Sequence, residues 1–155
     1  MEQDFLCAAL KGRIRYFTTR YRKAHDGYGR VAILVDGKEV VNMPFTVEDK
    51  GYAEVYSHKP SETGKSYAEL HQEVKIKYNE AGLFYPGDFG TALDSYLSNP
   101  ISDSLKSDDW LVRLLAILDR RVGKRTLLKL KSDITQLPPW LQEFYHLRFE
   151  SESLL

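Results

Sequence analysis

The spacing of apolar residues changes partway along the chain, and this change most constrains the fold. Residues 13–43 hold short runs of β-formers separated by turn residues, whereas apolar residues recur at helical spacing from Ser66 onwards. Strands first and helices afterwards is the order of an α+β protein. We therefore predict an N-terminal antiparallel β-meander of three or four strands, followed by a cluster of four to five α-helices.

The chain of 155 residues has no repeat and no low-complexity linker, which favours one domain. We assign a single domain to residues 1–155, with the β-meander at about 11–45 and the helical part at about 66–150. The formal net charge is zero, which argues against a nucleic-acid binder that acts through bulk charge. Cys7 is the only cysteine, so a disulfide within the chain is impossible.

The N-terminal segment does not resemble a signal peptide, because it carries Glu2 and Asp4 and lacks a basic region. The apolar runs, such as residues 5–10 and 114–118, are far shorter than the ~18–20 residues that a membrane span needs. We expect a cytoplasmic protein that does not associate with a membrane.

Three segments predict the strands of the meander. Residues 13–21 and 31–35 are rich in β-branched and aromatic residues. Asp36-Gly37 predicts a type I′ hairpin, after which residues 40–43 return as a third strand. Residues 52–56 alternate in polarity and are a candidate fourth strand, while residues 59–65 indicate a loop.

Capping residues mark the expected helices. Ser66 and Glu69 have the spacing of a capping box, which predicts the start of a helix. Gly82 is the expected end of that helix. Asp88 is a candidate cap for a second helix, and Pro138-Pro139 starts the last one. Residues 1–10 predict a short helix.

A further helix is expected between Ser107, a favoured N-cap residue, and Gly123. It carries a broad apolar stripe. Arg120 and Arg121 would occupy its last turn, where the helix dipole favours cations. A short helix would follow from Thr126.

No motif in the chain predicts a catalytic, metal or cofactor site. Gly64-Lys65-Ser66 lacks the glycine that a phosphate-binding loop needs five positions earlier, where Lys59 stands. Gly123-Lys124-Arg125 lacks the Ser or Thr of the same motif. His25-Asp26 lies in a turn, and no histidine pair has a short metal-ligand spacing. Asp119 beside two arginines is most simply a salt-bridge partner.

Two basic segments, residues 11–23 and 120–131, are the candidate binding surface. Tyrosines interleave with the first segment, as in proteins that stack nucleic-acid bases. The candidate residues are Arg13, Arg15, Tyr16, Arg20, Tyr21, Arg22, His25, Arg120, Arg121, Lys124 and Arg125. The simpler interpretation, which we favour, is that these charges pair internally with the acidic helices.

Two blocks of sequence resemble a known family. The first contains Lys11-Gly12-Arg13, residues 19–22, His25-Asp26 and residues 35–39, and the second contains residues 118–127 followed by Pro139-Trp140-Leu141 and residues 144–148. They are similar to a family of small, intracellular bacterial proteins of unassigned function. The resemblance covers most of the chain. It implies a bacterial, cytoplasmic, self-contained protein and supplies no activity, substrate or catalytic residue.

Three hypotheses of function remain open at this level. The preferred one is a non-enzymatic cytoplasmic interaction protein whose partner is an acidic protein. The alternative is a nucleic-acid-binding module that uses both basic segments, with affinity that falls steeply as salt rises. The third is an enzyme of unknown class that uses His25, Asp26 and Asp119 in a shared cleft.

Overall fold

The computed structural model of the chain describes residues 2–19 and 29–155, and it has the predicted order of strands followed by helices. Two 3-10 turns at Glu2–Phe5 and Ala8–Leu10 replace the expected short N-terminal helix. The sheet follows, and the rest of the described chain is helical. The helices are α1 (Phe45–Ser57), α2 (Pro60–Thr63), α3 (Tyr67–Glu80), α4 (Pro86–Ser98), α5 (Ile101–Ser104), α6 (Trp110–Ile117), α7 (Lys124–Leu130) and α8 (Pro139–Ser151), with a 3-10 helix at Lys131–Gln136.

The sheet is an antiparallel meander of β1 (Ile14–Thr18), β2 (Val31–Val35) and β3 (Lys38–Met43), in the order β1-β2-β3. Asp36 and Gly37 join β2 to β3 with φ of 50° and 82°. Positive φ at both central residues is the signature of the type I′ turn that the sequence predicts. The predicted hairpin is therefore confirmed.

The prediction of a fourth strand at residues 52–56 is wrong, because these residues lie within α1. The alternation within residues 52–56 places apolar residues two positions apart. The buried positions of the helix are four residues apart. Val47, Gly51 and Val55 are its buried positions. Because the middle member of this series is a glycine, the apolar residues alone do not show the helical spacing. Within the expected loop at residues 59–65, Pro60–Thr63 forms the single turn of α2.

The capping box at the start of α3 is confirmed. The Ser66 hydroxyl accepts from the Glu69 backbone N–H at 3.2 Å, and the Glu69 carboxylate accepts from the Ser66 backbone N–H at 2.7 Å. Gly82 follows the helix with φ of 78°, as expected of a C-terminal stop. Asp88 does not cap α4. It lies inside the first turn, where its carboxylate accepts from the Tyr85 N–H at 3.0 Å.

The helix expected between Ser107 and Gly123 is shorter than predicted. Asp109 caps α6 by accepting from the N–H of Leu111 at 2.9 Å, and Ser107 accepts in turn from the Asp109 N–H. The helix ends at Ile117. Arg120 and Arg121 therefore lie in the turn beyond it, and Gly123 is the residue before α7 instead of the end of α6. None of the helices within residues 2–19 and 29–155 is long and apolar enough to cross a membrane.

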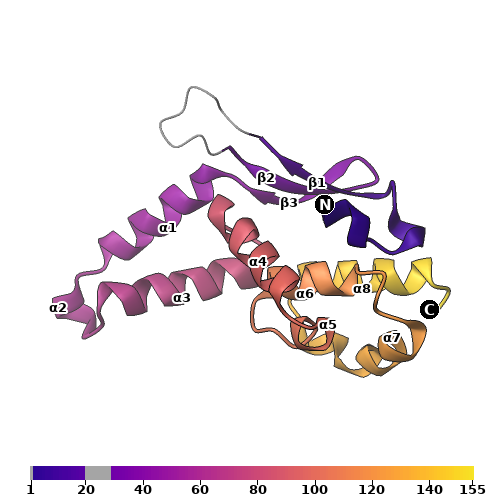
Figure 1. The fold of residues 1–155 in the computed structure, drawn as a ribbon. Coiled ribbons are helices and arrows are strands. Elements are labelled where there is room, and N and C mark those ends of the chain that lie inside the picture. Colours follow the sequence, from indigo (N-terminus) through magenta and orange to yellow (C-terminus); the bar gives the residue numbers. More distant parts are fainter. Residues whose placement is uncertain (1, 20–28) are drawn as a thin grey trace.

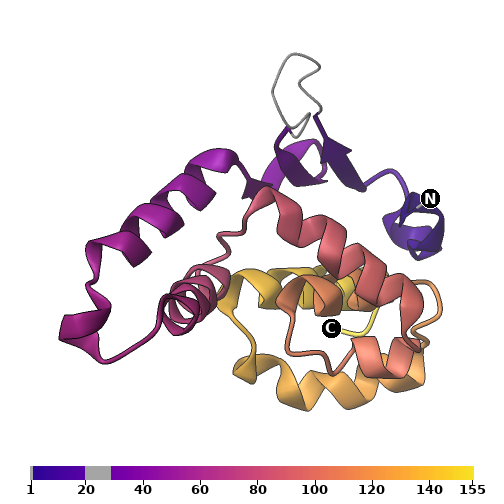
Figure 2. The same cartoon turned by 60° about the vertical axis from the view of Figure 1, so that its left-hand side comes forward.

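The sheet covers one side of a layer that contains α4, α6 and α8, and α7 lies on the opposite side of that layer (Figures 1 and 2). A continuous apolar core joins the two layers. It extends along the chain from Leu6 to Phe149 and includes Ile33 of the sheet and Leu114 of α6, which are both fully buried. We call this part the body.

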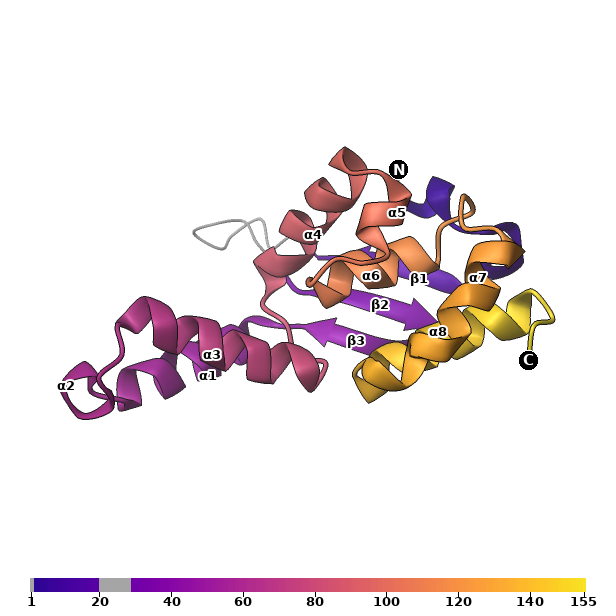
Figure 3. The ribbon, with the colours of Figure 1, turned by 90° about the horizontal axis from the view of Figure 1, so that it is seen from below.

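Helices α1 and α3 project from the body as an antiparallel pair joined by α2 (Figures 1 and 3). They pack mainly against each other, around a small separate cluster of Val55, Leu70 and Val74. We call residues 45–80 the arm. Its root is fixed to the body by the Trp140 indole, which donates to the Asn79 carbonyl at 3.0 Å.

Candidate functional site

Two of the predicted basic residues are held in ion pairs. The Arg13 guanidinium contacts both carboxylate oxygens of Asp36, at 2.9 and 2.7 Å. The hydrogen bond from Arg13 lowers the pKa of Asp36 below its ordinary value. Arg121 binds Asp119 in the same way, with 2.7 Å between Nη2 and Oδ2. These two arginines therefore pair internally, but with carboxylates in turns and not with the acidic helices that we expected.

Four other basic candidates are exposed and make no ion pair within the part of the chain that the structure describes: Arg15, Arg120, Lys124 and Arg125. β1, which carries Arg15, and α7, which carries Lys124 and Arg125, lie on opposite sides of the helical layer (Figures 1 and 2). The structure therefore does not bring these described parts of the two segments onto one face.

The remaining predicted site residues have different placements. Tyr16 is half-buried, with its ring centroid 5.8 Å from that of Phe89 in the core. Its ring is thus engaged within the body. Arg20, Tyr21, Arg22 and His25 lie outside the described residues, and so does Asp26.

Asp119 lies at the centre of a buried polar cluster. Its carboxylate accepts from the Tyr96 hydroxyl and, at 2.6 Å, from the backbone N–H of Arg121. The Arg121 guanidinium lies over the rings of Phe5 and Tyr96, 5.3 and 5.7 Å from their centroids. Burial tends to raise the pKa of Asp119, but the hydrogen bonds from Arg121 and Tyr96 outweigh it and lower this pKa. Burial and the bond to Asp119 raise the pKa of Tyr96.

The turn that contains Asp119 also binds the N-terminal segment through backbone hydrogen bonds. The Cys7 N–H donates to the Leu118 carbonyl at 3.0 Å, and the Arg120 N–H donates to the Phe5 carbonyl at 2.7 Å. The space beside Asp119 has no room for a water molecule. The cluster is therefore a structural clamp between the N-terminus, α4 and the end of α6, and a substrate has no access to Asp119. Among the described residues, no group of three His, Cys, Asp or Glu side chains could hold a metal ion.

An exposed group of aromatic side chains lies along the arm. Tyr52 and Tyr56 of α1 and Tyr67 of α3 are 42, 60 and 46% exposed. The rings of Tyr52 and Tyr56 are stacked, with centroids 6.2 Å apart, and Tyr56 lies 5.5 Å from Tyr67. His71 stands edge-on to Tyr52, at 4.9 Å. We call Tyr52, Tyr56, Tyr67 and His71 the tyrosine face.

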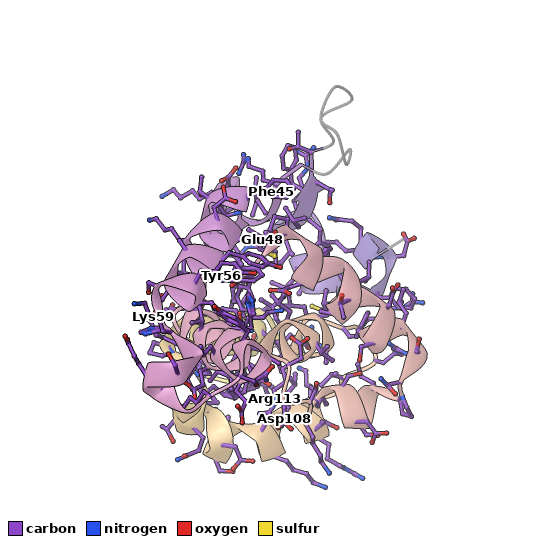
Figure 4. The ribbon with its side chains drawn as sticks, turned by 90° about the vertical axis from the view of Figure 1, so that its left-hand side faces the viewer. Phe45, Glu48, Tyr56, Lys59, Asp108 and Arg113 are labelled. Carbon is purple, nitrogen blue, oxygen red and sulfur yellow. The ribbon has the colours of Figure 1, made fainter. Side chains whose placement is uncertain are left out.

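Helical spacing and a glycine position this face. Tyr52 and Tyr56, like Tyr67 and His71, are four residues apart and therefore neighbours on one side of their helix. Figure 4 views the molecule from the tip of the arm, with Tyr56 on the side of α1 toward the body and Lys59 near the tip. Tyr85 extends the stack, with its ring 6.2 Å from that of Tyr52.

Tyr85 reaches this position because Gly51 has no side chain. A Cβ at Gly51 would lie 1.9 Å from the Tyr85 hydroxyl oxygen. The hydroxyl is buried and has no hydrogen-bond partner within the described chain, and burial raises its pKa to about 12. Tyr85 thus connects the exposed tyrosines to the body.

Four of the five lysines of the arm are held in ion pairs. Lys65 pairs with Glu73 at 2.6 Å, Lys77 pairs with Glu54, and Lys59 lies 3.8 Å from Glu62. Lys75 pairs with Asp88 of α4 at 2.7 Å. A surface that follows a phosphate backbone needs unpaired cations. The arm therefore presents aromatic area on a background of paired charges, which suits contact with a protein.

Sequence reasoning missed the tyrosine face because it treated residues 52–56 as a strand. The strand interpretation places Tyr52 and Tyr56 on one face of a sheet and gives no reason to expect Tyr67 and His71 beside them. The four-residue spacing in both Tyr52/Tyr56 and Tyr67/His71 was the available signal.

Comparison with known proteins gives the family of the chain. The family model described as the SF0329 protein family matches residues 1–149. That description names no activity, which agrees with the resemblance to a family of unassigned function. No match was found among curated proteins or among solved structures.

Proposed function

We propose that the chain, which belongs to the SF0329 protein family, is a non-enzymatic interaction protein that binds another protein through its tyrosine face. The observation that carries this proposal is the adjacent exposure of Tyr52, Tyr56 and Tyr67 in a stacked cluster. Tyrosine is enriched among the residues that dominate binding energy at protein interfaces. The setting that we propose is the bacterial cytoplasm, as the resemblance implies.

The stacking matters because it reduces the entropy that is lost on binding. An isolated exposed side chain loses about 0.5–1.5 kcal/mol of rotamer freedom when a partner immobilises it. Tyr52 is already confined between Tyr56, His71 and Tyr85. A partner would therefore meet a surface whose aromatic rings are largely ordered beforehand.

The acidic-partner hypothesis makes a different prediction. It requires binding to depend on the exposed cations at Arg120, Lys124 and Arg125 and to weaken as salt rises. The nucleic-acid alternative requires the same dependence and a steeper effect of salt. If the tyrosine face is the binding site, the affinity should change little with salt, because salt does not screen the burial of aromatic area.

A site-specific photocrosslinker tests the proposal. It is placed at Tyr56 and, as a matched control, at Leu128 on α7, which is 54% exposed. We expect one protein to be crosslinked in cells from position 56 and not from position 128. Crosslinks that are equal at both positions, or no protein crosslinked from position 56, would overturn the proposal.

The partner identified in this way is then purified and its affinity measured by calorimetry. We expect Tyr52→Ala/Tyr56→Ala to weaken binding at least about tenfold, and Arg120→Glu/Lys124→Glu to change it little. The opposite ranking would favour the acidic-partner hypothesis. Sedimentation of the chain alone reveals whether the partner is a second copy, and circular dichroism verifies that each variant is folded.

A further inference from the structure

A pocket in the body is lined by residues of the β2–β3 hairpin and α8. Figure 3 shows where these two elements lie in the fold. The volume of the pocket is about 440 Å³, which is within the ~300–1,000 Å³ of ligand pockets. It is separate from the tyrosine face, because its lining comes from the hairpin, Arg13 and α8. We call it the hairpin groove.

Five of the ten residues that line the hairpin groove are apolar. Trp140, Phe144 and Leu147 contribute one side of α8, at the spacing of consecutive helical turns. Val35 and Val40 contribute the hairpin side, and Val40 is 51% exposed. Such a surface can bury apolar side chains of a ligand.

A β-bulge gives Val40 its exposed position. Ile33 pairs with Val41 and Leu34 with Glu39, so Val40 has no partner on β2. A bulge redirects the side chain of the extra residue and increases the local twist of the strand. Without it, the residue before the buried Val41 would point to the opposite face of the sheet.

β3 is also an edge strand. It lies at the end of the order β1-β2-β3, and within residues 2–19 and 29–155 no strand pairs with its outer edge. An open edge offers backbone N–H and C=O groups to which an extended peptide can add as a further strand. An edge strand beside an apolar groove combines backbone recognition with pockets for side chains.

The charge at the rim of the hairpin groove is negative. Glu143 and Glu150 of α8 are exposed and have no ion pair among the described residues. Arg13 is paired with Asp36, and its charge also acts on Glu150. Apart from His146, one cation and three carboxylates line the groove, which gives these four residues a formal charge of −2. The rim therefore complements a ligand that carries lysine or arginine.

We propose that the hairpin groove binds an extended segment of another polypeptide that adds to β3 as a fourth strand. Alternate apolar side chains of this segment enter the groove between Val40 and Leu147. A lysine or arginine of the segment lies at Glu143 or Glu150. This inference is independent of the tyrosine face and would survive the failure of the proposed function.

Two synthetic peptides of about the length of β3, which has six residues, test the inference. Both alternate valine and threonine. One carries lysine and the other glutamate at its ends. Binding to the ¹⁵N-labelled full chain is followed by NMR up to about 1 mM peptide, a concentration that detects a Kd of about 1 mM. We expect the lysine peptide to shift the amides of β3 and α8, and the glutamate peptide to bind at least about tenfold more weakly.

Variants separate the groove from non-specific attraction. Val40→Arg places bulk and positive charge in the groove and should weaken the lysine peptide at least about tenfold. Leu97→Arg on α4, where the leucine is 41% exposed, is the matched control and should bind as the wild type does. Glu143→Gln/Glu150→Gln should remove the preference for lysine over glutamate. Tyr52→Ala/Tyr56→Ala should leave peptide binding unchanged.

Three results would overturn the inference. They are the absence of any shift with either peptide, shifts that map away from β3 and α8, and equal loss of binding in Val40→Arg and Leu97→Arg. Each result is meaningful only for folded variants, which the dispersion of the same NMR spectra establishes.

Discussion

The body and the arm both contain α-helices, but different interactions stabilise them. The body has one continuous core that includes residues from both ends of the described chain, from Leu6 to Phe149. The arm encloses only Val55, Leu70 and Val74 and leaves large aromatic side chains on its surface. A small core supports little stability alone. The contrast indicates that the arm is the less stable of the two parts.

Polar contacts of the turn after α6 bind both the N-terminal segment and α8. The turn after α6 binds the N-terminal segment through the Leu118 carbonyl and the Arg120 backbone N–H, and Arg148 of α8 donates to the Val122 carbonyl of the same turn at 2.8 Å. Arg148 is 2% exposed and pairs with Glu152 at 2.9 Å. One short turn thus connects both ends of the chain. Among the described residues of the arm there is no equivalent buried polar cluster. The ion pairs of the arm lie at its surface.

The largest expected effect is in the centre of the body. Leu114 is fully buried, and Leu114→Ala should lower the free energy of unfolding by about 3–5 kcal/mol, because it removes apolar contacts and leaves a cavity. Urea denaturation followed by circular dichroism measures this change. Leu97→Ala, at an exposed position, is the control and should cost no more than about 0.5 kcal/mol. A loss below about 1 kcal/mol at Leu114 would show that the core is not closely packed there.

The clamp around Asp119 should give the next effect. Asp119→Asn should cost about 2–3 kcal/mol at neutral pH, below the ~3–5 kcal/mol of a fully buried pair, because Arg121 is 43% exposed and stays hydrated. The folded pKa of Asp119 is lowered, so its stabilisation is present above the unfolded pKa and is lost as pH falls through the folded value.

The difference between wild type and Asp119→Asn should therefore shrink as the pH falls from about 5 to about 2. Urea denaturation at several pH values measures it. Asp36→Asn, which breaks the exposed pair with Arg13, is a control and should have a small effect at every pH. A difference that stays constant with pH would contradict the assignment of a charged, hydrogen-bonded Asp119.

The smallest effect is expected in the arm. Val55→Ala removes two buried methyl groups and should cost about 1.5 kcal/mol. The cost should appear as local opening of α1 and α3, with roughly tenfold faster amide hydrogen exchange there. Amides of α4, α6 and α8 should exchange as in the wild type. Equal acceleration in the body would mean that arm and body unfold as one unit.

The parts of the fold that were predicted correctly have local causes. Asp36-Gly37 adopts the two positive φ angles that its residue types favour, and Ser66 with Glu69 forms a capping box within one turn. The errors arise where a local pattern has two interpretations. Residues 52–56 fit a strand or a helix, and α6 ends at Ile117 although Arg120 and Arg121 suit a helix terminus.

Asp119 shows the intermediate case. Its place beside two arginines predicts an ion pair, and the pair with Arg121 is confirmed. Nothing in the local sequence indicates that Tyr96, 23 residues away, donates to the same carboxylate, or that Phe5 lies under the guanidinium. Such contacts depend on how distant elements pack.

The sequence by itself determined the order of strands and helices, the hairpin turn and the capping box of Ser66 and Glu69, because these depend on interactions within a few residues. Only the tertiary structure decided that Tyr52, Tyr56, Tyr67 and His71 share one face, that Asp119 is sealed and that β3 and α8 enclose a groove. Each of these requires two segments distant in sequence to meet. The position where they meet is set by burial of the shared apolar core, which no single segment specifies.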